Sequence, residues 1–268
     1  MLRQRIITAV IGLPLLIAAI WFGDPWFTLL IVALAVLGSL EFYRMAIRLE
    51  IQPITYFGAA CVLLLVSSPH CPYVATTSFL ITSSVAISLV WLLFRSPREQ
   101  AFNNWAWTVA GLLYTGWMLS YWVELRNLEA GKAWVFWAMF TTMASDTCAF
   151  FAGRAWGKHP LAPALSPGKT WEGAIGGLLA GVIVSLILGM IFSLPFNCWQ
   201  MAFLGGIIST FAQLGDMVES LLKRNTGTKD SGSLLPGHGG ILDRIDSYIF
   251  TGVTAYYCAA FAISWVTV

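Results

Sequence analysis

The residues best suited to chemistry lie close together near the C-terminal end, between Asp216 and Asp246. This segment reads DMVESLLKRNTGTKDSGSLLPGHGGILDRID and separates two almost wholly apolar stretches. Because only 10% of the chain is charged, so dense a group of acids, bases and glycines indicates a specific function for this segment. Glycine-rich backbone can turn successive N–H groups onto an anion, and carboxylates can hold Mg²⁺ together with phosphates. We therefore predict a site for a Mg-nucleotide or pyrophosphate group.

The first part of this segment fits one face of a helix. Its chemically active side chains follow at i, i+3, i+4 and i+7, with a further base at the flank: Asp216, Glu219, Ser220, Lys223 and Arg224. A simple helix-end ion pair between Glu219 and Lys223 is the alternative. That pair would leave Asp216 unexplained at membrane depth, where an ionisable group is costly. We therefore favour a functional role for this face.

The next part is a glycine-rich loop, residues 225–242, which contains Lys229 and His238. Its glycines leave the backbone N–H groups open to an anion, and Lys229 adds a positive charge. A flexible, solvated loop is the alternative, although Pro236 and the apolar residues around it favour an ordered structure. His238 could contact a ligand or could satisfy loop carbonyls; we leave both roles open.

A second acidic helix follows the loop. Asp243 and Asp246 lie at i and i+3 and therefore share a face, whereas Arg244 points elsewhere. Carboxylates are hard ligands that suit Mg²⁺, and Asp216 and Asp243 come from two different helices that could clamp one ion. An Asp–Arg capping network at the helix start is the alternative.

A separate polar cluster lies upstream, between residues 146 and 172. It contains Asp146 within an apolar stretch and then Gly168-Lys169-Thr170. These three residues are similar to the end of a P-loop, but Pro163 stands where that motif requires a glycine, so the P-loop interpretation fails. Lys169 and Thr170 would still begin a helix whose exposed N–H groups favour phosphate. An ordinary basic loop is equally compatible with this cluster.

The elements that position these residues are predicted to be membrane helices. The chain has 268 residues, of which 58% are hydrophobic, and a mean hydropathy of +0.75. Apolar stretches of spanning length recur along it. We predict nine, at 6–22, 26–47, 54–69, 76–94, 106–124, 134–152, 172–193, 199–221 and 247–267. The fold class is therefore all-α, a polytopic helical integral membrane protein with about nine transmembrane helices; the short third stretch leaves eight possible.

The basic residues predict the orientation. With the N-terminus in the cytoplasm, all but two of the 15 Lys and Arg residues fall in inner segments, and only Arg126 and Lys132 lie outside. Such a bias follows the positive-inside rule. It places the loops 153–171 and 222–246 in the cytoplasm, and with nine spans the C-terminus lies outside. We interpret the basic N-terminal stretch as an uncleaved first helix.

The chain is predicted to divide by role into two regions. Residues 1–125 would form a scaffold with lipid-facing helices, and residues 126–268 a catalytic region. Within the scaffold, Glu41 is predicted to pair simply with Arg44 and Arg48, and a substrate role is the alternative. The five cysteines and three histidines show no metal spacing, so we expect neither zinc nor a disulfide framework. We expect membrane lipids, but no nucleic acid, as partners.

The segment from Ser220 to Asp246 resembles the signature of the phosphatidate cytidylyltransferases, also called CDP-diacylglycerol synthases. It reads S-x-x-K-R-x4-K-D-x-G-x2-L-P-x-H-G-G-x2-D-R-x-D. The upstream SPGKTWEG and the entry Gly215–Ser220 also resemble this family. The similarity is close over the C-terminal half and only general over the N-terminal half.

The resemblance implies transfer of CMP from CTP to phosphatidic acid, which yields CDP-diacylglycerol and pyrophosphate in phospholipid biosynthesis. It implies Mg²⁺ as cofactor with K⁺ beside it, and a homodimer. It also implies a place in the bacterial cytoplasmic (inner) membrane, with the active site facing the cytoplasm. The attacking lipid phosphate is already anionic, so alignment and charge neutralisation would carry catalysis.

Roles follow for individual residues as hypotheses. Asp216 and Asp243 would bind the metal, supported by Asp246, and Lys223 would complete the catalytic group. The remaining candidates would contact substrate: Asp146, Lys169, Thr170, Ser220, Arg224, Lys229, His238 and Arg244. Two rival functions remain open: a CTP-using lipid kinase, such as a polyprenol or phytol kinase, and an ion-coupled transporter.

Overall fold

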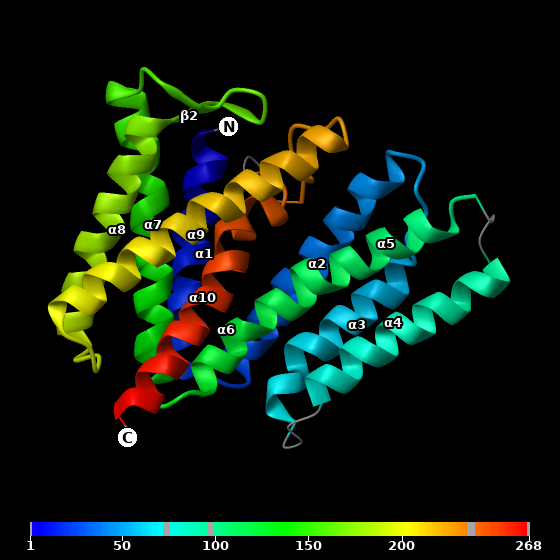
Figure 1. Ribbon diagram of the computed structural model, residues 1–268, viewed down its shortest axis with the longest axis horizontal. Coiled ribbons are helices and arrows are strands. Elements are labelled where there is room, and N and C mark those ends of the chain that lie inside the picture. Colours follow the sequence, from blue (N-terminus) through cyan, green and yellow to red (C-terminus); the bar gives the residue numbers. More distant parts are fainter. Residues whose placement is uncertain (1, 72–75, 96–98, 235–238, 267–268) are drawn as a thin grey trace. The chain divides into compact units, whose positions relative to one another are not determined.

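The structure, a computed structural model, describes residues 2–71, 76–95, 99–234 and 239–266, and it is mainly helical (Figure 1). Its α-helices are α1 (Leu2–Phe22), α2 (Trp26–Ile47), α3 (Thr55–Ser67), α4 (Thr76–Arg95), α5 (Ala101–Gly111), α6 (Met118–Asn127), α7 (Gly131–Trp156), α8 (Trp171–Ile191), α9 (Cys198–Asn225) and α10 (Leu242–Val266). A short 3-10 turn, η1 (Ser68–His70), extends α3, and a π-helical segment, η2 (Leu112–Trp117), joins α5 to α6. Each predicted apolar stretch overlaps helical structure in the described part of the chain.

The helices are those of a membrane protein. In the described part of the chain, α2, α4, α7, α8 and α9 are long and apolar enough to cross a membrane, by length and composition. In lipid, a helix satisfies its own backbone hydrogen bonds, which is why apolar stretches of this length fold as helices. The chain is therefore an all-α integral membrane protein. The number of nine spans and the cytoplasmic N-terminus stay predictions.

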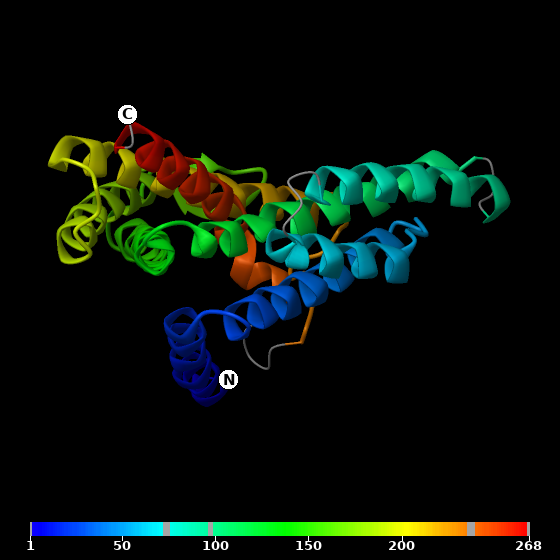
Figure 2. The same cartoon turned by 90° about the horizontal axis from the view of Figure 1, so that it is seen from below.

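The chain forms two compact units, which we describe separately. The N-terminal unit contains residues 1–123 and 225–245, and the C-terminal unit contains residues 124–224 and 246–268. Within the N-terminal unit, α2, α3, α4 and α5 run alongside one another (Figures 1 and 2). The glycine-rich loop belongs to this unit, although its sequence lies far from these helices. The predicted division by role into 1–125 and 126–268 stays a prediction.

Glycines allow close packing in the N-terminal unit. Tyr43 of α2 is fully buried, and its hydroxyl donates to the carbonyl oxygen of Thr108 at 2.9 Å. Gly58 of α3 and Gly111 of α5 lie against the Tyr43 ring, where an added Cβ would overlap it. Small residues at these two positions therefore let α3 and α5 approach α2.

A stripe of small residues has the same effect in the C-terminal unit. On α8 every fourth residue is small and buried: Gly173, Gly177, Gly181, Ser185 and Gly189. A Cβ on Gly177 would lie 2.7 Å from the Ser145 carbonyl oxygen of α7, and one on Gly181 would overlap Ser209 of α9. The stripe therefore lets α8 pack closely against both neighbours, which fixes the walls of the site described below.

A β-hairpin, which the sequence did not predict, lies in the loop 153–171. Strands β1 (Pro160–Ala162) and β2 (Ser166–Thr170) pair antiparallel. The strands are short and contain proline and glycine, so they lack the alternating pattern from which strands are predicted. The Thr170 hydroxyl accepts from the Gly173 N–H at 3.2 Å, which caps α8 as the predicted helix start requires. The hairpin thus delivers Lys169 and Thr170 to the N-terminus of α8.

Candidate active site

Three carboxylates converge in the C-terminal unit, and we call Asp216, Glu219 and Asp246 the carboxylate cluster. One carboxylate oxygen of each lies within 4.8 Å of the others. Asp216 and Glu219 share a face of α9, which continues to Asn225 as the spacing predicted. Asp246 comes from α10, whose backbone approaches α9 at Gly215, where a Cβ would lie 2.6 Å from the Asp246 carbonyl oxygen. Carboxylates this close repel one another unless a cation lies between them.

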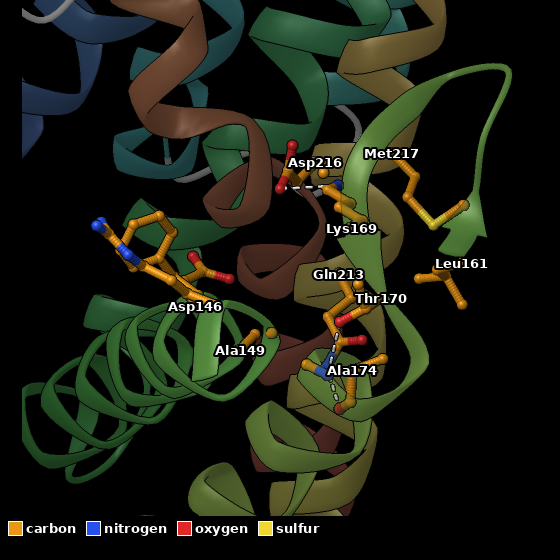
Figure 3. A pocket seen from close by; sticks show the side chains of 14 residues that line it. Asp146, Ala149, Leu161, Lys169, Thr170, Ala174, Gln213, Asp216 and Met217 are labelled. Atoms are coloured by element: carbon orange, nitrogen blue, oxygen red, sulfur yellow. Dashed lines mark hydrogen bonds and ion pairs between the residues drawn. The ribbon is translucent and has the colours of Figure 1, made fainter. Parts of the chain in front are cut away.

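Two lysines partly neutralise the carboxylate cluster. Lys223 forms a close ion pair with Glu219 one turn away, so the helix-end pair that was considered as the alternative is present. The Lys169 ammonium lies 2.8 Å from Asp216 Oδ2, which joins β2 to α9 (Figure 3). Two ammonium groups do not balance three carboxylates. With all three acids ionised, the cluster has one negative charge more than these two lysines supply, so it can accept a further cation.

A cavity of about 450 Å³ lies beside Asp216, with a volume typical of ligand sites. Its wall joins residues from both predicted chemical segments, namely Asp146, Lys169, Thr170 and Asp216 (Figure 3). Apolar side chains such as Phe150 complete the wall. The arrangement can hold a polar, anionic group beside the carboxylate cluster, with Lys169 as counter-ion.

Sequence reasoning missed three features of this region. Gln213 lines the cavity and donates to the Ala174 carbonyl oxygen at 3.0 Å; its place one turn before Asp216 was the available signal. Arg154 also lines the cavity. Glu219 was placed on the favoured face of α9 but was not named as a site residue, and it belongs to the carboxylate cluster. The i, i+3 spacing from Asp216 already placed it on that face.

The other predicted residues of α9 lie near its C-terminal end. Ser220 is buried within the C-terminal unit. The Arg224 side chain is exposed, and its Nε donates to the Leu165 carbonyl oxygen in the hairpin turn at 3.0 Å. Arg224 therefore holds the hairpin from one side while the Lys169–Asp216 ion pair holds it from another.

The glycine-rich loop lies in the N-terminal unit, where Asp243 binds its backbone. Asp243 Oδ2 accepts from the Gly240 N–H at 2.9 Å and from the Ser231 N–H at 3.1 Å. Lys229 and Arg244 are exposed, and the predicted ligand contact at His238 lies outside the described residues. Asp216 belongs to the C-terminal unit, so the predicted metal clamp between Asp216 and Asp243 stays a prediction.

The predicted partners of Glu41 are wrong. No ion pair joins Glu41 to Arg44 or Arg48 in the described part of the chain, and both arginines are exposed. Glu41 is fully buried and accepts instead from Ser231, inside the glycine-rich loop, and from Leu242, at its end. The two arginines are close to Glu41 in sequence. The Glu41 side chain is buried, however, whereas both arginine side chains are exposed.

Comparison with known proteins identifies the family. Residues 3–262 match the model described as the cytidylyltransferase family. The phosphatidate cytidylyltransferase of Bacillus subtilis is 31% identical over 97% of this chain and 98% of its own. That of Staphylococcus haemolyticus is 33% identical over 93% and 95%, and the chloroplastic phosphatidate cytidylyltransferase 4 of Arabidopsis thaliana is 33% identical over 95% and 72%. The chain therefore belongs to the cytidylyltransferase family, together with the phosphatidate cytidylyltransferases.

Proposed function

We propose that this membrane protein transfers CMP from CTP to phosphatidic acid. An oxygen of the lipid phosphate attacks the α-phosphorus of CTP and forms a new P–O bond. The bond from that phosphorus to the bridging oxygen breaks, and pyrophosphate leaves with CDP-diacylglycerol as the lipid product. The observation that carries the proposal is the carboxylate cluster beside a lysine-lined cavity, in a chain similar over its length to phosphatidate cytidylyltransferases.

The donor set fits the proposed Mg²⁺. Three carboxylates with oxygens within 4.8 Å of one another are hard ligands of the kind that Mg²⁺ shares with substrate phosphates. We propose Asp216 and Asp246 as its holders, with Glu219 beside them and Asp243 as the predicted further ligand. When bound, Mg²⁺ would supply positive charge to the phosphate oxygens. We also propose the K⁺ that the resemblance implies, because carboxylate oxygens can bind this cation as well.

The basic residues would bind the phosphates. Lys169 lines the cavity at the N-terminus of α8, where the exposed N–H groups also favour an anion. Lys223 and Arg224 end α9 beside the carboxylate cluster, and Lys229 would contribute from the loop. Asp146 lies in the cavity wall across from Lys169 (Figure 3). Because the lipid phosphate is already an anion, these residues need to align the two phosphates rather than remove a proton.

We also propose the topology that the basic residues predict. Nine spans with a cytoplasmic N-terminus would place both charged loops in the cytoplasm of a bacterium, where CTP is dissolved. The site would then lie at the cytoplasmic side of the inner membrane, where a soluble nucleotide can meet a lipid phosphate. A homodimer in this membrane completes the proposal.

The test is an assay of the purified protein with labelled CTP and phosphatidic acid. A CMP-bearing lipid together with pyrophosphate is expected, and release of CDP would instead indicate a lipid kinase. Asp216→Asn should lower turnover at least about 100-fold. Mg²⁺ should raise the melting temperature of the wild-type protein but not of Asp216→Asn, because a ligand stabilises only the protein that binds it. Near-normal turnover with unchanged Mg²⁺ dependence would remove Asp216 from this role.

A further inference from the structure

The glycine-rich loop is held by a carboxylate from a distant helix. Glu41 lies in α2, has no exposed surface, and is 190 residues away in sequence from its partner Ser231. Burying a carboxylate in an apolar helix is costly unless polar groups compensate it. Such a residue is therefore expected to have a specific task.

Glu41 joins a point inside the loop, Ser231, to its last residue, Leu242. Its Oε2 accepts from the Ser231 hydroxyl at 3.1 Å and from the Leu242 N–H at 2.9 Å. Ser231 is the seventh residue of the loop, and Leu242 is the last residue of the loop and the first of α10. One carboxylate oxygen thus draws together two points that are separated by most of the loop.

The loop backbone lies against the Glu41 side chain. A Cβ added at Gly232 would overlap Glu41 Oε1, and a Cβ added at Gly240 would overlap both Ser231 Oγ and Glu41 Oε2. We call Ser231, Gly232, Gly240 and Leu242 the loop neck. Two of its four residues are glycines at positions where only a missing side chain permits the contact.

Asp243 binds the same neck through different donors. It accepts from the Ser231 and Gly240 N–H groups, whereas Glu41 accepts from the Ser231 hydroxyl and the Leu242 N–H. The hydrogen bond from the Leu242 N–H to Glu41 also affects α10, because Leu242 precedes Asp243 in the first turn of this helix. Holding the Leu242 N–H fixes the start of the helix from which Asp243 and Asp246 extend.

We propose that Glu41 is a positioning residue, which closes the loop neck so that the loop backbone and the first turn of α10 are preorganised for the phosphates of CTP. This role rests on the proposed function, since it gives the loop its ligand. Glu41 itself is buried behind the loop and touches no reacting atom. Its loss should therefore affect nucleotide binding more than lipid binding.

The kinetic test compares Glu41→Ala, Glu41→Gln and Ser39→Ala in the full-length protein. Glu41→Ala should raise the KM for CTP about tenfold, or about 1.4 kcal/mol, and change the KM for phosphatidic acid less than about twofold. Glu41→Gln keeps an acceptor oxygen and should stay within about threefold of wild type. Ser39→Ala removes another buried polar group of α2, whose hydroxyl donates to the Val36 carbonyl within the same helix, and should leave both KM values unchanged.

A double-mutant cycle tests the contact itself. Ser231→Ala should raise the KM for CTP about threefold alone but add little in the Glu41→Ala background, because the shared hydrogen bond is already lost. Equal changes in both KM values, or full additivity, would overturn the positioning role. This cycle and Glu41→Gln keep the proposal testable if Glu41→Ala does not fold.

Hydrogen exchange separates this proposal from the reaction. In Glu41→Ala the amides of residues 229–234 and 239–243 should exchange about tenfold faster, whereas those of α8 should not change. If wild type forms no CMP-lipid but the loop still opens in Glu41→Ala, the proposed reaction fails and the loop-closing role stands. If wild type is active and the loop amides are unaffected, the positioning role fails alone.

Discussion

The carboxylate cluster of the C-terminal unit and the loop neck of the N-terminal unit both bury acids, but they satisfy them differently. In the cluster, Asp216, Glu219 and Asp246 face one another, with lysine ammonium groups as counter-ions. At the neck, Glu41 and Asp243 face N–H and hydroxyl donors of the loop. Carboxylates that converge need a cation, whereas carboxylates that meet backbone donors fix a conformation.

This difference predicts opposite balances between activity and stability. Removing a charge from the carboxylate cluster relieves repulsion and removes a cation ligand, so activity should fall while stability is kept. Removing the carboxylate of Glu41 or Asp243, which accepts hydrogen bonds from the loop neck, leaves donors unsatisfied, so stability should fall together with activity. Variants in the carboxylate cluster and at the loop neck therefore test whether the two regions differ in this way.

Asp246→Asn should have the largest effect on activity. The change removes one of the converging charges and a proposed Mg²⁺ ligand, so CMP transfer should fall at least about 100-fold. The melting temperature without Mg²⁺ should stay the same or rise, because repulsion within the cluster decreases. Pyrophosphate release and a melting curve measure the two quantities.

The matched control is Glu129→Gln, an exposed acid in the same unit, which should leave both quantities unchanged. If Asp246→Asn were strongly destabilised, the cluster would act like the loop neck, and its proposed role in cation binding would be contradicted.

Lys169→Ala should have the next largest effect. Lys169 lines the cavity and pairs with Asp216 at 2.8 Å, so its loss removes a proposed phosphate ligand and a counter-ion together. We expect kcat/KM for CTP to fall about 30-fold, mainly through KM. Steady-state kinetics with varied CTP measure this change.

Lys158→Ala is the control, because Lys158 is an exposed base that precedes the same hairpin. If both lysines gave the same small loss, Lys169 would contribute only general positive charge, and the ion pair with Asp216 would have no special part in nucleotide binding.

Gly240→Ala tests the loop neck. The added methyl group would overlap Ser231 Oγ and Glu41 Oε2, so the neck should open. We expect a loss of stability of about 1–3 kcal/mol and a rise in the KM for CTP of about fivefold. Chemical denaturation and kinetics measure the two effects.

Gly206→Ala in α9 is the glycine control, since the nearest atom to a Cβ there would be Val182 Cγ2 at 3.8 Å, an ordinary contact distance. A Gly240→Ala protein with unchanged stability would show that the neck is loose, which would contradict the close contact with Glu41.

These two regions also differ in how far the sequence predicts them. The helical face of Asp216, Glu219 and Lys223 follows from spacing alone, because residues three and four apart share a side of a helix. The start of α8 after Thr170 follows from the same local logic. Periodicity and capping describe neighbours along the chain, and the carboxylate cluster is largely built from such neighbours.

The loop neck has no local signal. Glu41 and Ser231 are 190 residues apart, and nothing in the sequence around Glu41 indicates which backbone groups it meets. The nearby Arg44 offered a more obvious partner and gave the wrong prediction. The ion pair of Lys169 with Asp216 is similarly non-local, because it depends on the hairpin. The hairpin strands lack the alternation of apolar and polar residues from which strands are predicted. Tertiary contacts of this kind follow from packing rather than from spacing.

The smallest effect is expected from His159→Ala, in the hairpin next to the site. His159 Nδ1 lies 2.6 Å from Glu172 Oε1, but the His159 side chain is 77% exposed. An exposed pair of this kind is screened by water and contributes little, so kcat/KM should change less than about threefold. The hairpin is still held by the Lys169–Asp216 ion pair and by Arg224 at Leu165. A tenfold loss measured by the same CTP kinetics would mean that the hairpin depends on this exposed pair, and the ion pair with Asp216 would then be too weak to hold Lys169 at the carboxylate cluster.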